Sequence, residues 1–415
     1  YRLILKDIVK KIPFLRKILK KLYLNNRSAD YEKISNKCTT DSKLVVFESY
    51  QGRSYSCSPK AIYQYMLSCP KFSGYSYVWV FREINAHGSF PQNTRLVKFD
   101  SEESFYAYAQ AGTWITNSRL RDFYIPKSDQ KYIQCWHGTP FKKIGCDVTA
   151  AGNATSTVQE IYDEYTNEAK RISLLVSPSD FTTSKLISAF NLKSSGKENC
   201  IIQKGYPRND ALFNTDLKTV ENLKNTLNIP QNKIVVLYCP TFRDNQFSGS
   251  GYTLEPAVDF DSLKDKCGSD FIILFRAHYF IANSFDFKKY SGYVLNVSEY
   301  DDINDLYLIS DILITDYSSV FFDYANLKRP MLFYHYDLEE YKNKMRDFYF
   351  GTAMLPGPVI QTQEKLENEL NKILQDIRKG GSGLLKYEKA LNAFNKKFNP
   401  LEDGHSAERT VKEIF

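Results

Sequence analysis

The feature that most constrains the fold of this chain is its alternation of short apolar runs with segments of helix length. A first series contains "KLVVFES", "YSYVWVF", "TWITNS" and "KYIQCWHG", and a second contains "KIVVLYCPTF", "DFIILFRAH", "DILITDYSS" and "PMLFYHY". Runs rich in β-branched and aromatic residues, separated by helices, are typical of parallel strands that are buried on both faces. The sequence therefore predicts an α/β protein with two units of similar size, which meet near residues 205–230.

The length of the chain agrees with this division, because 415 residues exceed what one hydrophobic core usually accommodates. We expect a basic segment at residues 1–30, a first domain at 31–210 and a second domain at 211–415. The eight cysteines are widely spaced and form no CxxC pair. Free thiols in a reducing compartment are therefore favoured over disulfides or a metal site.

The start of the chain is strongly basic, with nine Lys or Arg and one Asp in the first 27 residues, whereas the rest is close to neutral. Apolar residues from Ile4 to Leu22 recur there at steps of three and four, beside lysines. This pattern favours an amphipathic helix lying in an anionic membrane surface. A solvated helix docked on the protein, or the remnant of a preceding domain, is the alternative. No run reaches the ~20 apolar residues of a spanning helix, so we expect a peripheral protein on the cytoplasmic face of the membrane.

Ligands of open α/β sheets bind beyond the carboxyl ends of the strands, so the polar residues after each run are the candidates for chemistry. His137 directly follows "YIQCW", with Gly138 and Pro140 opening the next segment and Lys142 nearby. An imidazole has the pKa range of a general base near neutral pH. A hydrogen-bonded structural histidine is the alternative interpretation.

Further candidates follow the strands of the second series. Arg276 and His278 lie on the same side of one strand, where they suit phosphate oxygens or an ion pair with a carboxylate. Ser318 and Ser319 follow Asp316 and precede a helix, so that one of them is either a phosphate-binding N-cap or simply a cap. The weaker candidates are Thr241, Arg243, His335, Asp337, Tyr341 and Arg346.

Several common motifs are missing from the sequence: a P-loop, a dinucleotide fingerprint, a zinc-binding HExxH and a convincing metal-binding DxD pair. A transferase that uses no metal would have to neutralise its leaving group with arginine, histidine, serine and a helix dipole. These are the residue types that follow the predicted strands.

The blocks "CWHGTPFKKIG", "GYPRNDALF", "YCPTFRDN", "FRAH" and "DILITDYSSVFFDYANLKRP" resemble, in this order, the CDP-glycerol glycerophosphotransferase family, which builds or primes teichoic acids and capsule polymers. The resemblance implies a GT-B-like fold, with two Rossmann-type domains facing a cleft. It implies an acceptor-side N-terminal domain and a C-terminal domain that binds CDP-glycerol. It also implies transfer of glycerol phosphate to a hydroxyl of an undecaprenyl-diphosphate-linked acceptor, with release of CMP and with no cofactor, metal or nucleic acid.

The resemblance also assigns roles to residues. His137 matches the base that deprotonates the acceptor hydroxyl, and His278 is the second predicted catalytic residue, placed with Arg276 on the pyrophosphate. Ser318 and Ser319 match phosphate contacts that Asp316 orients. The other predicted substrate-binding residues are Gly138, Thr139, Lys142, Arg208, Thr241, Arg243, His335, Asp337, Tyr341 and Arg346.

One departure from the family pattern is visible. The family commonly has Arg-Gly before Phe-Tyr, whereas this chain has Arg346 followed by Asp347. An added carboxylate there weakens an anion contact or alters the acceptor. The alternatives to a glycerol phosphate transferase are a CDP-ribitol-dependent enzyme, a nucleotide-sugar glycosyltransferase on the same fold, and a non-catalytic polyanion-binding protein at the membrane. The sequence does not separate a primase from a polymerase, nor does it give the oligomeric state.

Overall fold

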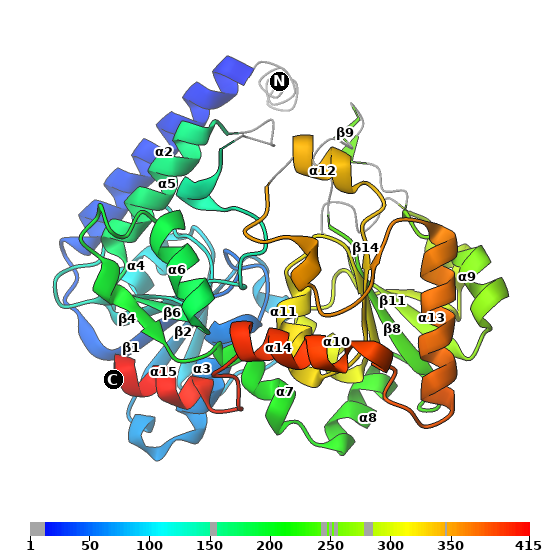
Figure 1. The fold of residues 1–415 in the computed structure, drawn as a ribbon. Helices are drawn as coiled ribbons and strands as arrows, with labels where there is room; N and C mark the ends of the chain where they lie inside the picture. Colours follow the sequence, from blue (N-terminus) through cyan, green and yellow to red (C-terminus); the bar gives the residue numbers. More distant parts are fainter. Residues whose placement is uncertain are drawn as a thin grey trace, which may run out of the picture.

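The computed structural model describes residues 13–149, 156–241, 247–248, 251–252, 256–277, 285–344 and 347–415. Within these residues the chain forms two α/β units side by side, each with a parallel sheet between layers of helices (Figure 1). The predicted fold class is therefore confirmed. A short antiparallel pair, β9 (Phe247–Ser248) and β10 (Gly251–Tyr252), lies outside both sheets.

The first unit contains a sheet of order β3-β2-β1-β4-β5-β6-β7, in which all neighbouring strands are parallel. Its central strand β4 (Ala111–Thr116) is buried along its whole length, because helices cover both faces of the sheet. The strands are β1 (Asp41–Glu48), β2 (Ser76–Phe81), β3 (Thr94–Lys98), β4 (Ala111–Thr116), β5 (Lys131–Gln134), β6 (Leu174–Ser177) and β7 (Ile201–Gln203).

The second unit repeats this organisation with a parallel sheet of order β12-β11-β8-β13-β14-β15. The strand order reverses between β8 and β13, and ligands of such sheets bind at this switch point. The strands are β8 (Ile234–Cys239), β11 (Phe271–Phe275), β12 (Val294–Asn296), β13 (Ile312–Thr315), β14 (Met331–Tyr334) and β15 (Val359–Ile360).

Helices connect the strands and cover the sheets (Figure 1). Those of the first unit are α2 (Pro13–Ser35), α3 (Cys57–Ser68), α4 (Glu102–Gln110), α5 (Val158–Arg171) and α6 (Asp180–Ala189). Those that follow are α7 (Ala211–Asn214), α8 (Leu217–Thr226), α9 (Phe260–Cys267), α10 (Ile303–Ile309), α11 (Val320–Tyr324), α12 (Leu338–Lys344), α13 (Gln363–Arg378), α14 (Glu388–Phe398) and α15 (Ser406–Ile414). All eight cysteines are free thiols, as predicted, and five of them are buried.

The basic segment predicted at residues 1–30 is described from residue 13 onward, and residues 1–12 lie outside the described part. Helix α2 extends to Ser35 and packs against α4, with Tyr31 buried beside Phe105. Near its other end Ile18, Leu19 and Leu22 are exposed. In the portion of the chain that the structure describes, no helix combines the length and the apolar character needed to cross a bilayer.

The chain crosses between the two units twice. After α14, which packs in the core of the second unit, the chain returns and α15 buries Val411 and Ile414 beneath the first sheet (Figure 1). The carboxylate of Asp210, on the first crossing, accepts hydrogen bonds from the main-chain N–H groups of Ser406 and Ala407 at 2.8 and 2.7 Å. The two crossings therefore lie side by side. The division of the chain at residue 210 stays a prediction, and the packing of α15 favours assigning its residues to the first unit.

Candidate active site

His137 lies just beyond the carboxyl end of β5, where the chain turns sharply. Trp136 has a left-handed backbone (φ 51°), and its N–H donates to the side-chain oxygen of Gln134 at 2.9 Å. Nδ1 of His137 lies 2.8 Å from the main-chain oxygen of Asn117, which follows the neighbouring strand β4. Because a carbonyl oxygen only accepts, Nδ1 carries the proton and Nε2 keeps a lone pair. The imidazole is thus in the tautomer that a general base requires.

The surroundings of His137 keep its ring neutral. The residue retains exposed surface, yet protein surrounds the imidazole closely enough that burial lowers its pKa to about 4. The hydrogen bond to Asn117 opposes this shift, while the cationic side chains of Arg208 and Arg119 add to it. At neutral pH the ring is therefore an uncharged proton acceptor.

The loop that carries His137 approaches the turn after β13 in the second unit. A Cβ atom added at Gly138 would lie 3.2 Å from Oγ of Ser319 and 4.0 Å from Nη2 of Arg208. Ser319 occupies the N-cap position of α11, but its side chain makes no capping hydrogen bond. Gly138 is thus needed for a close approach, and the predicted base and the predicted phosphate-binding serine lie together between the units.

Arg208 joins the two units beneath this point. Its guanidinium group is almost fully buried and forms a two-pronged ion pair with Asp323 of α11, at 3.1 and 2.9 Å. Although burial lowers it, the Asp323 carboxylate raises the pKa of Arg208 well above the usual range. Asn209 donates to the same carboxylate at 3.1 Å. Arg208 is therefore a fixed positive charge under the space between His137 and Ser319.

The turn after β13 is held by predicted site residues. Oδ1 of Asp316 accepts the main-chain N–H of Thr241 at 2.8 Å, which joins the ends of β13 and β8 at the switch point. His335 is fully buried, and its Nε2 donates to the main-chain oxygen of Asp316 at 3.0 Å. The hydroxyl of Tyr317 donates to Asp337 at 2.9 Å. These contacts shape the turn that presents Ser318 and Ser319, and direct contact of Thr241, Asp316, His335 or Asp337 with a substrate stays a prediction.

Lys142 belongs to a second contact between the units. Its Nζ donates to the hydroxyl of Tyr341 at 3.2 Å, and the Tyr341 ring stacks on that of Tyr317 at 4.0 Å. The main-chain N–H of Lys143 donates to the oxygen of Asp347 at 2.9 Å, and their side chains form an ion pair at 2.7 Å. The carboxylate that departs from the family pattern is therefore neutralised by a lysine of the His137 loop.

The remaining predicted site residues have other surroundings. Thr139 is buried and accepts a hydrogen bond from the hydroxyl of Thr182 at 3.3 Å, which anchors the loop on α6. Arg276 is partly buried and donates to the main-chain oxygens of Val297 and Tyr300 at 3.2 and 2.6 Å. Three predicted residues lie outside the described part of the chain: Arg243, His278 and Arg346.

Sequence reasoning missed two residues that the structure places at this site. Asn117 orients His137, and Asp323 holds Arg208. Asn117 could have been found, because it follows "TWIT" and neighbouring strands bring their carboxyl ends together. Asp323 carries no local signal, since its partner lies 115 residues away. Within the described residues, no group of three His, Cys, Asp or Glu side chains is placed to hold a metal ion.

Comparison with known proteins assigns the chain to a family and agrees with the observed fold. The family model described as CDP-Glycerol:Poly(glycerophosphate) glycerophosphotransferase matches residues 31–415. The chain therefore belongs to this family. Among solved structures, the wall teichoic acid polymerase TagF superposes with a TM-score of 0.84 and 34% sequence identity, covering 95% of each chain.

Individual relatives are of similar kind. The chain is 36% identical to the teichoic acid poly(glycerol phosphate) polymerase of Bacillus subtilis (strain 168), over 99% of this chain and 53% of the relative. It is also 36% identical to the teichoic acid glycerol-phosphate transferase of Staphylococcus aureus (strain NCTC 8325 / PS 47), over 90% of this chain and 93% of the relative. The ribitol-phosphate polymerase TarK of the same S. aureus strain is more distant, at 29% identity over 70% of the chain. The chain thus spans about half the length of the first of these relatives.

Proposed function

We propose that this chain transfers glycerol phosphate from CDP-glycerol to a hydroxyl group of a teichoic acid acceptor and releases CMP. The observation that carries the proposal is the position of His137, a neutral imidazole with its Nε2 lone pair kept, on a loop that meets the Ser319 turn of the other unit. Membership in the glycerophosphotransferase family supports the choice of donor and reaction.

In the proposed reaction Nε2 of His137 takes the proton of the acceptor hydroxyl. The hydroxyl oxygen attacks the phosphorus that bears glycerol, the bond from that phosphorus to the bridging oxygen breaks, and CMP leaves with the electron pair. Ser318, Ser319 and Arg276 hold the diphosphate, and the fixed charge of Arg208 lies beneath it. Positioning and charge stabilisation supply most of the catalysis in such transfers.

The low pKa of His137 in the enzyme without substrate is compatible with this role. A bound diphosphate brings negative charge close to the imidazole and favours its protonated form, so it raises the pKa of the ring. The histidine thus becomes a stronger base when the donor is in place. Coupling of base strength to donor binding also limits wasteful proton transfer in the empty enzyme.

We further propose that the acceptor is linked to a lipid and that the enzyme works at the cytoplasmic face of the membrane. Ile18, Leu19, Leu22 and Tyr23 form an exposed apolar stripe on α2, in the most basic part of the sequence. Such a combination favours binding to an anionic bilayer surface through apolar insertion and charge attraction. The amphipathic segment would hold the active site close to a lipid-bound substrate.

The donor is tested by measuring CMP release from CDP-glycerol and CDP-ribitol in parallel, with a lipid-linked disaccharide acceptor that carries or lacks one glycerol phosphate. CMP from CDP-glycerol, lost in the His137→Ala variant while CDP-glycerol still binds, is the expected result. CMP from CDP-ribitol alone would make the chain a ribitol-phosphate transferase, and nucleotide binding without CMP release from either acceptor would refute the proposed acceptor. The acceptor preference and the length of the product distinguish a primase from a polymerase.

A further inference from the structure

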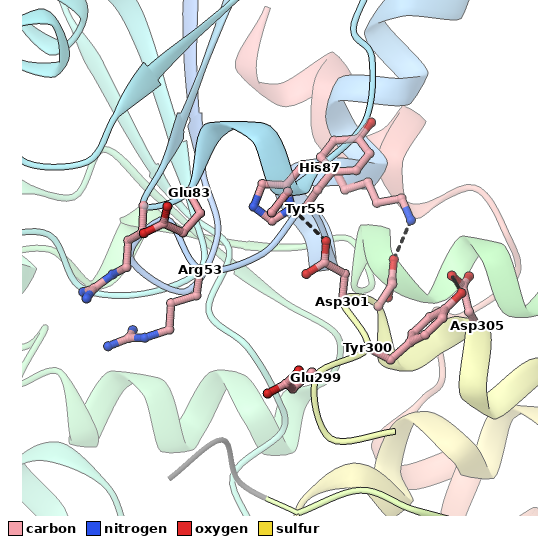
Figure 2. Close-up of a pocket in the computed structure, with 12 residues that line it drawn as sticks. Arg53, Tyr55, Glu83, His87, Glu299, Tyr300, Asp301 and Asp305 are labelled. Carbon is pink, nitrogen blue, oxygen red and sulfur yellow. Dashed lines mark hydrogen bonds and ion pairs between the residues drawn. The ribbon is translucent and has the colours of Figure 1, made fainter. Parts of the chain in front are cut away.

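A cavity of about 670 Å³ lies between the two units, where β1 and β2 of the first sheet end. This is within the ~300 to 1,000 Å³ of typical small-molecule sites. Figure 2 shows Arg53 and Glu83 on the wall from the first unit, and Glu299, Asp301 and Asp305 on the wall from the second unit. Neither the proposed transfer step nor any of the predicted site residues uses this cavity.

A hydrogen bond and an ion pair join the walls of the cavity at one end. Nδ1 of His87 lies 2.8 Å from Oδ2 of Asp301, which a dashed line marks in Figure 2. Nζ of Lys60 lies 2.7 Å from Oδ2 of Asp302. The side chain of His87 is only 4% exposed. Since each pair joins the first unit to the second, the cavity has this shape only while the two units keep their present arrangement.

The cavity is adjacent to the candidate base. Arg53, on its wall, donates to the main-chain oxygen of Tyr50 at 2.8 Å. The N–H of Tyr50 donates to the side chain of Asn117 at 2.7 Å, and Asn117 is the residue that orients His137. The ring of Tyr50 lies 5.9 Å from that of His137. The Tyr50 turn therefore stands between the cavity and His137, with Arg53 of the cavity wall bonded to it on one side and the imidazole close to it on the other.

The charges of the lining indicate what kind of molecule fits. Five carboxylates face three permanently cationic side chains, so that the cavity is net negative and repels a diphosphate or a phosphate. The lining also mixes carboxylates, which only accept hydrogen bonds, with guanidinium groups, which only donate. A hydroxyl group does both, whereas a phosphate lacks donors and an ammonium group lacks acceptors. The lining is thus suited to an uncharged ligand with several hydroxyl groups.

We propose that this cavity is an acceptor subsite that binds a sugar residue next to the hydroxyl group from which His137 takes the proton. The inference rests on the proposed function, because it gives the cavity a part in acceptor binding. Contacts with Arg53 and Arg82 on one wall and with Glu299 and Asp305 on the other would orient the sugar. Since both units line the site, acceptor binding would also favour the arrangement in which His137 faces Ser319.

The test fills the cavity without touching the candidate base. Ala86 lines the cavity, and the preceding residue, Asn85, is exposed on the same short helix (Ile84–Ala86) but is not part of the lining. Initial rates of CMP release are measured for Ala86→Trp and for the matched control Asn85→Trp, with each substrate varied in turn. We expect Ala86→Trp to raise the KM for a lipid-linked disaccharide about tenfold or more, which corresponds to the loss of about one good hydrogen bond to the sugar. The KM for CDP-glycerol should stay unchanged. Asn85→Trp should match the unmodified protein.

A second acceptor, an oligomer of glycerol phosphate without sugar, identifies what the cavity binds. The Ala86→Trp effect should be confined to the acceptor that contains the disaccharide. An equal effect on both acceptors, a larger effect on the glycerol phosphate oligomer, or a raised KM for CDP-glycerol would overturn the proposal.

Direct binding separates this inference from the proposed function. Saturation-transfer NMR with the free disaccharide should show transfer of saturation from the unmodified protein to the sugar, whether or not the protein releases CMP. The transfer should be weaker with the Asp305→Asn variant. Disaccharide binding without any CMP release would refute the proposed function and leave a sugar site in place. No transfer of saturation to the disaccharide, in a protein that releases CMP, would overturn the cavity assignment alone.

Discussion

The main-chain oxygen of Asn117 lies 2.8 Å from Nδ1 of His137, and this contact decides which nitrogen of the ring can act as a base. The acceptor is part of the backbone, so substitutions at position 117 do not remove it. The side chain of Asn117 meanwhile holds Tyr50. One residue thus fixes both the tautomer of the histidine and the turn that separates it from the cavity.

The first prediction concerns pH. Because the pKa of His137 in the enzyme without substrate is lowered to about 4 and the neutral ring is the active form, kcat/KM for CDP-glycerol should stay level as the pH falls from 7 to about 5 and decline only as it passes through about 4. The decline in kcat should lie at higher pH, since a bound diphosphate raises the pKa. An NMR titration of the ring, with His137→Gln to assign the signal, gives the pKa directly. A kcat/KM decline centred near 6.5 would contradict the burial of the ring.

The second prediction concerns the ion pair between the units. Asp323→Asn leaves the buried charge of Arg208 without its carboxylate, so we expect the free energy of unfolding to fall by about 3 to 5 kcal/mol. Calorimetry or urea unfolding measures the change. The exposed pair of Arg378 and Asp270 provides the control, and Asp270→Asn should cost less than about 1 kcal/mol. Equal losses of unfolding free energy in the two variants would mean that the ion pair of Arg208 and Asp323 stabilises the contact between the units no more than an exposed pair would.

The third prediction concerns the carboxylate that departs from the family pattern. Lys143→Glu and Asp347→Lys each place like charges together and should lower kcat up to about fivefold, the scale of a partly exposed ion pair. The double variant restores opposite charges and should recover most of the rate. Steady-state kinetics of the four proteins form a double-mutant cycle. Additive losses would show that Asp347 acts independently of the His137 loop.

The fourth prediction concerns the membrane. Leu22→Asp removes apolar area from the exposed stripe of α2 and adds a negative charge, so it should weaken co-sedimentation with anionic vesicles several-fold. Leu217 is 82% exposed on a different helix and serves as the control. Leu217→Asp should bind vesicles as the unmodified protein does. Unchanged sedimentation of Leu22→Asp would exclude the stripe as the anchor.

The sequence predicts the two units and brings the His137 loop and the Ser318–Ser319 turn to strand ends, because buried parallel strands leave a clear apolar pattern. It does not predict the pairing of Arg208 with Asp323 or of Lys143 with Asp347, since charged residues look alike along a chain and their partners depend on how the units dock. The sequence likewise does not predict that His335 is buried and holds the Asp316 turn by a hydrogen bond. A polar residue after a strand can support a site as well as contact a ligand.

The paired crossings at Asp210 and Ser406 restrict how the molecule can move. Two adjacent covalent connections define a hinge axis. Rotation of one unit about this axis leaves the length of both connections unchanged, whereas sliding or twisting of one unit past the other strains both connections. Opening would therefore swing the His137 loop away from Ser319 along an arc and return it to the same register. The path of the backbone would therefore return the proposed base and the proposed phosphate-binding turn to the same alignment after each opening.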